Sequence, residues 1–225
     1  MTWFSDPDAV ARYAEGPVRL VPGFDALQRM TTLLLRESVP PAGNVLVLGA
    51  GGGLELKRFA DSEPGWRFVG VDPSAEMLKL AQATLGPLAE RVELHEGYID
   101  TAPDGPFDGA TCLLTLHFVP AEERLRTLKE IWRRLLPGAP LVVAHHSFPQ
   151  SLDEKARWLK RYAAYAVDSG VPASDAERAI TAISAQLPVL APEEDERLLK
   201  AAGFEGVELF FAGFSFKGWV AHKPA

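Results

Sequence analysis

Three glycines alternate with other residues directly after a short apolar run, and this pattern predicts a cofactor site. The run Val45–Leu48 is followed by Gly49, Gly51 and Gly53, and then by Leu54. Glycines at a strand-to-helix turn let a ligand approach the backbone closely, because no side chain stands in the way. A dinucleotide fingerprint, G-x-G-x-x-G, needs its third glycine where this chain has Leu54. The G-x-G-x-G pattern fits S-adenosylmethionine (SAM) instead, since SAM has no phosphate to hold.

A carboxylate ends the next apolar run. Asp72 follows Arg67–Val71 and lies 19 residues beyond Gly53. At the end of a strand it can accept two hydrogen bonds from ribose hydroxyls. Helix capping is the other interpretation of this aspartate, and the upstream glycines favour the ribose. Met77 lies one helical turn past Pro73, where it can cover an adenine ring.

Histidines follow two later strands. His117 follows the run Gly109–Leu114, and a pKa near neutrality would let it take a proton from a methyl acceptor. Binding of its ring to a backbone carbonyl is the alternative, and both stay open. His145 and His146 follow the fifth strand, and adjacent residues of an extended chain point in opposite directions, so at most one lines the cleft. Because a metal would need these rings to converge with His117 and a carboxylate, we predict no metal site.

The elements around these residues alternate between short strands and helices, which predicts an α/β, Rossmann-like fold with a seven-stranded, mostly parallel sheet. We expect parallel strands at Asn44–Leu48, Arg67–Val71, Arg91–Leu94, Gly109–Leu114 and Leu141–Ala144, and a terminal hairpin of Gly206–Phe211 and Phe214–Ala221, turning around Ala212-Gly213. The expected helices are Phe24–Glu37, Leu54–Ala60, Ser74–Leu85 and Ala121–Leu136. Ligands of open α/β sheets bind at the carboxyl ends of the strands, so the site residues should meet there.

We expect one domain in four parts: an N-terminal cap (1–43), a SAM-binding core (44–150), a helical insert (151–202) and terminal antiparallel strands (203–225). The insert carries Trp158, Tyr162 and Tyr165 at helical spacing. Three interpretations of this aromatic stripe stay open: core packing, a roof over the acceptor, and a homodimer face.

The composition of the chain limits the classes of protein to which it can belong. The chain has 225 residues, a net charge of −7 and a single cysteine, Cys112, which cannot form an internal disulfide. There is no signal-peptide pattern at the N-terminus and no apolar run long enough for a membrane span. We therefore expect a cytoplasmic protein without a membrane partner. The negative charge disfavours a nucleic-acid substrate, although a local basic patch is compatible with it.

Together these motifs resemble class I SAM-dependent methyltransferases. The resemblance rests on Val45–Gly53, the block Asp72–Leu78, Glu96-Gly97-Tyr98-Ile99, Phe107-Asp108 leading to Leu116-His117-Phe118, and Leu135-Leu136-Pro137-Gly138. The flanks, Arg19–Phe24 and Lys200–Phe204, make the chain most similar to the carboxy-SAM synthase family. The cofactor contacts that the resemblance implies are Phe24, Gly49, Ala50, Gly51, Asp72, Pro73, Tyr98, Ile99 and Leu113.

The chain departs from that family at three positions. The acidic residue usual in the first strand is Val47, and an aspartate usual beside adenine is Tyr98. The arginine that holds the carboxylate of carboxy-SAM falls on Ile180, and Arg178, two residues away on a helix, would point elsewhere. We therefore expect binding of SAM and transfer of its methyl group to a small-molecule acceptor. The alternatives are a carboxy-SAM synthase-like enzyme, a nicotinamide-dependent oxidoreductase, which Leu54 disfavours, and a non-enzymatic SAM-binding protein.

Overall fold

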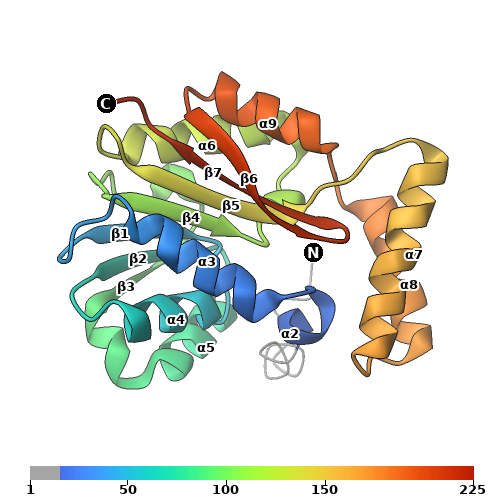
Figure 1. The fold of residues 1–225 in the computed structure, drawn as a ribbon. Coiled ribbons are helices and arrows are strands. Elements are labelled where there is room, and N and C mark those ends of the chain that lie inside the picture. The colour runs from blue at the N-terminus through green and yellow to red at the C-terminus, as the bar shows by residue number, and fades with distance from the viewer. Residues whose placement is uncertain (1–15) are drawn as a thin grey trace.

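A computed structural model describes residues 16–225, and the first 15 residues of the expected cap lie outside this range. Its centre is a seven-stranded sheet of order β3-β2-β1-β4-β5-β7-β6 (Figure 1). The strands are β1 (Asn44–Leu48), β2 (Arg67–Asp72), β3 (Val92–Glu96), β4 (Gly109–Leu113), β5 (Pro140–His146), β6 (Glu205–Gly213) and β7 (Phe216–His222). The first five are parallel, and β7 pairs antiparallel with both β5 and β6. The predicted fold class is confirmed.

The central strands are apolar because helices cover both faces of the sheet. Every residue of β4 and β5 is buried, as expected for a parallel sheet covered on both sides. Figure 1 shows α3, α4 and α5 on one face and α6 and α9 on the other. The helices are α2 (Gly16–Leu20), α3 (Phe24–Arg36), α4 (Leu54–Ser62), α5 (Ala75–Leu85), α6 (Ala121–Arg134), α7 (Leu152–Asp168), α8 (Ala173–Gln186) and α9 (Pro192–Ala201). Two hydrophobic cores result, one on each face of the sheet.

The segment 151–202 forms two separate structures. α7 and α8 pack together as a helical pair beyond the carboxyl ends of the parallel strands, whereas α9 returns to the sheet beside α6 (Figure 1). The pair is tied at its base, where Ser147 bridges Leu190 and the Phe148 amide donates to the Leu190 carbonyl at 3.2 Å. The carboxyl edge therefore faces α7 and α2, which also contact each other.

The terminal hairpin turns two residues later than expected. Its strands end at Gly213 and resume at Phe216, so the turn is Phe214-Ser215 rather than Ala212-Gly213. Phe214 adopts a φ of 50°, a left-handed conformation that sequence preference would assign to the preceding glycine. Gly213 serves a different purpose, since a Cβ there would lie 2.9 Å from the Pro22 carbonyl oxygen.

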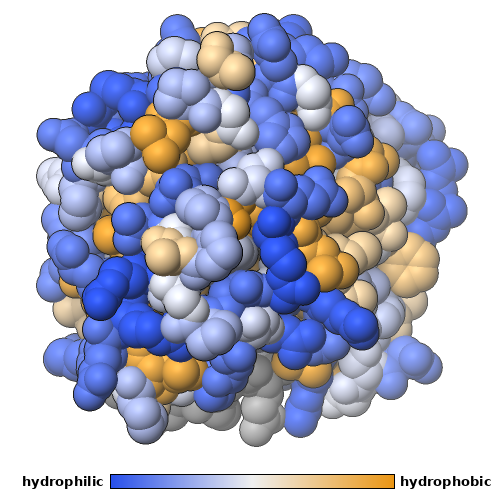
Figure 2. All heavy atoms as spheres, turned by 60° about the vertical axis from the view of Figure 1, so that its left-hand side comes forward, coloured by the Kyte–Doolittle hydropathy of each residue, from blue (hydrophilic) through white to orange (hydrophobic). Residues whose placement is uncertain are grey.

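On the face drawn in Figure 2, hydrophilic residues predominate and hydrophobic ones form scattered groups. Within residues 16–225, no helix combines the length and the apolar character that crossing a bilayer requires.

Candidate active site

The glycine turn after β1 is fixed by contacts on two sides. Gly49, Gly51 and Gly53 all have positive φ, of 81°, 49° and 80°. A Cβ at Gly49 would lie 1.9 Å from the Thr115 hydroxyl oxygen, and one at Gly53 would lie 2.9 Å from the Cα of Ala81. Gly49 therefore allows β4 to approach, and Gly53 allows α4 to pack on α5. The turn is shaped by its own neighbours before any ligand binds.

Asp72 joins this turn to the end of β2. One carboxylate oxygen accepts from the Gly51 amide at 2.9 Å, and the other accepts from the Ser74 amide at 2.9 Å. Burial raises the pKa of Asp72, and these two hydrogen bonds oppose that shift. Ser74, rather than Asp72, caps α5 by accepting from the Met77 amide at 3.3 Å. Since each carboxylate oxygen can accept a second hydrogen bond, ribose hydroxyls can still bind here.

The residues predicted to contact adenine differ in exposure. Tyr98 is 68% exposed, whereas Ile99 and Met77 are buried. Pro73 is exposed at the end of β2, next to Asp72. An adenine ring at this edge would therefore meet the exposed Tyr98 on a surface whose floor consists of buried apolar groups. The role of Tyr98 as an adenine contact stays a prediction.

Two further residues that are predicted to contact the cofactor lie on the α3 side of the sheet. Leu113 is buried in the core, and its carbonyl oxygen accepts from the Thr115 hydroxyl at 2.9 Å. Phe24 begins α3 and is partly buried against the same core. Leu114, between Leu113 and Thr115, has a φ of 55°, which is unusual for a leucine. Such backbone strain is often found at functional sites, and here it turns the end of β4 back toward Gly49.

His117 is buried beyond the end of β4, and its ring orientation limits what it can do. Its Nδ1 accepts from the backbone amide of His146 at 3.2 Å. Burial, together with His146, His145 and Arg124, holds the pKa of His117 well below its usual range. The neutral ring therefore carries its proton on Nε2. In this arrangement the Nε2 of His117 can donate a hydrogen bond, whereas the general-base interpretation of His117 would need a free acceptor nitrogen.

The adjacent histidines point to opposite faces of the sheet, as expected. His146 stacks on Phe216 with ring centres 4.0 Å apart, its Nδ1 lies 3.1 Å from the Ser215 hydroxyl, and it contacts Tyr162. Burial and the neighbouring His145 lower the pKa of His146 to about 3. His146 is thus the member of the pair on the side of α7.

His145 belongs to a buried charged cluster on the other face. Its Nε2 lies 3.2 Å from Asp195 Oδ1, without the alignment of a hydrogen bond, and Arg124 Nη1 lies 3.3 Å from the same oxygen. Burial alone would raise the pKa of Asp195, but His145, Ser147 and Arg124 hold it below its usual range. This cluster joins α6, α9 and β5 behind the site.

The aromatic stripe of α7 faces the terminal hairpin. Tyr162 is buried against His146 and Phe216, and Tyr165 contacts Phe214 with ring centres 6.3 Å apart. Packing against the hairpin therefore accounts for Tyr162 and Tyr165. Ile180 lies instead at the seam between α7 and α8, and Arg178 is exposed and paired with Asp175.

Sequence reasoning missed a buried carboxyl below the glycine turn. Glu55, in the first turn of α4, is 8% exposed and accepts a hydrogen bond from the Thr111 hydroxyl at 3.0 Å. Thr111 is paired in register with Val47, so this carboxyl lies beside the strand position that lacks an acid. Burial raises the pKa of Glu55 to about 8, against a weaker opposing effect of Thr111. Glu55 is therefore protonated near neutral pH.

We predict that the free energy of unfolding of Glu55→Gln increasingly exceeds that of wild type as pH increases. The folded wild type holds this proton up to about pH 8, whereas the unfolded chain releases it near 4.5. Wild-type stability therefore falls between these values, by about 2 kcal/mol from pH 6 to 7.5, and glutamine removes this loss. Urea unfolding of wild type and variant at these two pH values measures the difference in their stability. Glu122→Gln, on the exposed side of α6, is the control, and an equal effect of the two variants would contradict the prediction.

The core of the chain is similar to known proteins. Residues 45–138 match a family model described as a methyltransferase domain. This segment contains the glycine turn, Asp72 and His117. The core of this chain is therefore similar to methyltransferase domains.

The curated relatives extend the similarity to the flanks. A carboxy-S-adenosyl-L-methionine synthase of Chromohalobacter salexigens is 26% identical over 224 residues, covering 98% of this chain and 83% of the relative. A protein of the same name from Desulfotalea psychrophila is 25% identical over 211 residues, covering 92% and 86%. The resemblance to this family is confirmed at low identity.

Solved structures support the fold. An O-methyltransferase family protein from Burkholderia thailandensis has a TM-score of 0.72 at 15% identity, covering 100% of this chain and 64% of that one. Human N-acetylserotonin methyltransferase, solved with SAM, has a TM-score of 0.64 at 16% identity, covering 99% and 58%. The chain thus spans about three fifths of the length of such neighbours, and the shared part is the class I methyltransferase fold.

Proposed function

We propose that this protein transfers the methyl group of SAM to a nucleophilic atom of a small-molecule acceptor. The observation that carries the proposal is the joined arrangement of the glycine turn and Asp72, whose two oxygens are fixed by the Gly51 and Ser74 amides. A carboxylate held in this way accepts hydroxyl hydrogen bonds without rearranging. Asp72 would hold the ribose, Gly51 would let the cofactor pass close to the backbone, and Tyr98 and Ile99 would contact adenine.

The chemistry supplied by SAM is an electrophilic methyl group, and the residues of this chain position the acceptor. His117 donates from Nε2, which suits a hydrogen bond to the acceptor and not removal of its proton. Tyr162, His146 and Phe216 exclude water at the ends of β5 and β7. Methyl transfer depends mainly on such positioning and on a dry site.

A carboxy-SAM synthase-like reaction is the second candidate, and the names of the curated relatives favour it. It requires a cation near the transferred group. Ile180 cannot supply one, and Arg178 is exposed and paired with Asp175. An apolar residue cannot compensate a buried carboxylate, so we favour SAM itself as the ligand. Mass spectrometry of the small molecule retained by the purified protein separates the candidates, since SAM, its demethylated product, carboxy-SAM and a nicotinamide nucleotide differ in mass.

We predict that SAM raises the melting temperature of the protein and that NAD or NADP at the same concentration does not. Binding to the folded state stabilises it by an amount that grows with the logarithm of ligand concentration over Kd, and Leu54 removes the third glycine that a pyrophosphate turn needs. Thermal unfolding with each ligand checks this, with adenosine as a control for the shared nucleoside. A larger shift with either nicotinamide nucleotide would contradict the proposed function.

A further inference from the structure

The segment that follows β3 lies directly beside the carboxylate proposed for the ribose. Asp72 is paired in register with Glu96, and the Gly97 amide donates to the Asp72 carbonyl at 3.0 Å. Tyr98 comes next in the chain, so a base attached to a ribose on Asp72 would lie beside Tyr98. The groups around Tyr98 therefore decide how the adenine of the cofactor is recognised.

The backbone acceptors of this segment are used by the segment itself. The Tyr98 carbonyl accepts from the Thr101 amide at 3.1 Å and from the Thr101 hydroxyl at 3.1 Å. The Ile99 carbonyl accepts from the Ala102 amide at 3.3 Å. Since a carbonyl oxygen has two lone pairs, the Tyr98 carbonyl has none left for the amino group of adenine.

The side-chain acceptors near Tyr98 are also engaged. The Thr101 hydroxyl oxygen lies 3.0 Å from Nε2 of His95. The Asp100 carboxylate pairs with Arg126 of α6, and Arg126 pairs in addition with Glu123 at 2.7 Å. These contacts hold Asp100 against α6, so its carboxylate is already committed to a cation of the protein.

Tyr98 itself offers the adenine an aromatic ring and a hydroxyl that faces water. The side chain is 68% exposed, and within residues 16–225 its hydroxyl has no hydrogen-bond partner. A hydrogen bond from adenine to this hydroxyl would replace one to water, so it would contribute little affinity. The Tyr98 ring and the buried Ile99 can still pack against the base.

We propose that this cofactor site recognises adenine by contact with its ring and not through its amino group, and that Tyr98 is the residue that sets this specificity. A site built around a hydrogen bond to a ligand group rejects an analogue that lacks the group, because the partner in the protein is left unpaired. Here no such partner is left unpaired. The inference rests on the proposed function, and it extends the accepted cofactors to SAM analogues that are altered at the adenine amino group.

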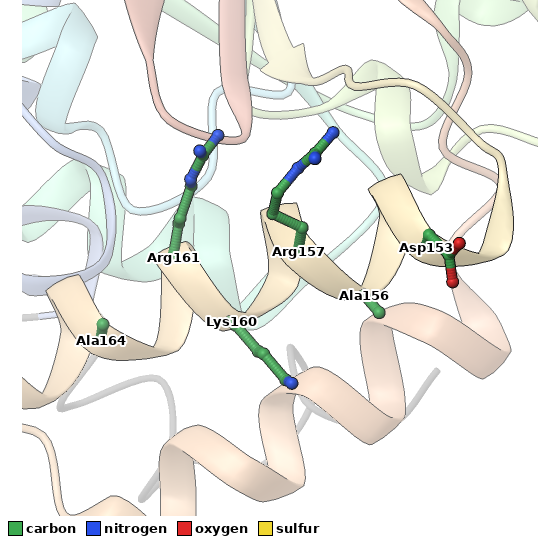
Figure 3. A pocket seen from close by; sticks show the side chains of 6 residues that line it. All are labelled: Asp153, Ala156, Arg157, Lys160, Arg161 and Ala164. Carbon is green, nitrogen blue, oxygen red and sulfur yellow. The ribbon is translucent and has the colours of Figure 1, made fainter.

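A shallow hollow on α7 is separate from this part of the molecule. It has a volume of about 530 Å³, and Figure 3 shows its two arginines pointing toward the β6–β7 hairpin. β3 is one edge strand of the sheet, whereas α7 packs against the hairpin at the other edge. The side chains of Tyr162 and His146, which lie between this hollow and His117, are buried. A substitution in the hollow is therefore a suitable control for one at Tyr98.

Titration calorimetry with S-adenosylhomocysteine (SAH) and two analogues tests the proposal. One analogue has purine in place of adenine and so lacks only the amino group, and the other has a methyl group on that nitrogen. Wild type should bind both analogues within threefold of SAH. Tyr98→Asp supplies a charged acceptor and should bind SAH at least tenfold more tightly than the purine analogue. Tyr98→Phe, which keeps the ring, should behave as wild type does.

The matched control is Ala164→Asp, which adds the same charge at an exposed position of the α7 hollow (Figure 3). Its affinities for all three ligands should equal those of wild type, and altered affinities would place the ligand in the hollow instead.

Three further results would overturn the proposal. A tenfold preference of wild type for SAH over the purine analogue would mean that the site does bind the amino group, and its loss in Asp100→Ala would assign it to that carboxylate. Tenfold weaker binding of the methylated analogue would mean that the amino group is enclosed. Equal binding of SAH and the purine analogue by Tyr98→Asp would mean that position 98 does not set the specificity. If wild type bound neither SAH nor its analogues, the proposed function itself would fail, which distinguishes the two failures.

Discussion

Asp195→Ala is expected to lower the free energy of unfolding by about 3–5 kcal/mol, which is the usual effect of leaving a buried charge without its partner. Asp195 is 4% exposed and lies within 3.3 Å of both Arg124 and His145, which are each 1% exposed. Without the carboxylate, the Arg124 guanidinium keeps the backbone carbonyls of Val119 and Pro188 as its hydrogen-bond partners within residues 16–225. Urea unfolding followed by circular dichroism measures the loss.

A matched aspartate on α8 provides the control. Asp175 also lies in the first turn of a helix and pairs with an arginine, Arg178, but both side chains are exposed. Asp175→Ala should change stability by less than about 1 kcal/mol, because exposed ion pairs contribute little. Similar losses in the two variants would show that the cluster around Asp195 does not stabilise the fold in the way described.

Asp72→Ala is expected to weaken SAM binding by about 2–4 kcal/mol, or 30-fold and more. The substitution removes the acceptor proposed for the ribose hydroxyls, and it also removes the hydrogen bond that fixes the Gly51 amide. Asp72→Asn, which keeps one acceptor oxygen, should show a smaller loss. Titration calorimetry of SAM into each variant gives the affinities.

The control for Asp72 lies on the neighbouring helix. Asp61→Ala removes an exposed carboxylate of α4 that pairs with Lys57, so it changes the net charge equally without touching the glycine turn. Its SAM affinity should equal that of wild type. If Asp72→Ala also bound SAM as wild type does, the ribose would have to lie elsewhere.

The sheet could be predicted from the sequence because its central strands are buried on both faces and stand out as apolar runs. The positions of Gly49 in a turn and of Asp72 at a strand end could be predicted equally well, since turn conformation and strand ends depend on local sequence. The position of α9 could not be predicted, because its helical pattern is the same whether it packs beside α7 or beside α6. Contacts with distant segments, such as that between Arg124 and Asp195, show which sheet face it covers.

The chemistry of the site depended on contacts between distant segments. The ring state of His117 is set by the His146 amide, 29 residues away, which no spacing rule reveals. Glu55 reads in the sequence as an ordinary acid in the first turn of a helix, and its burial follows from packing against Thr111. Lys217 and Trp158 meet only because the terminal hairpin turns against α7.

A crystal structure of the protein with SAH tests the central claim most directly. We expect one molecule per chain across the glycine turn after β1, with both ribose hydroxyls on Asp72, adenine beside Tyr98 and Ile99, and the sulfur facing His117. SAH bound away from the Gly49–Gly53 turn, or with its ribose out of contact with Asp72, would contradict it.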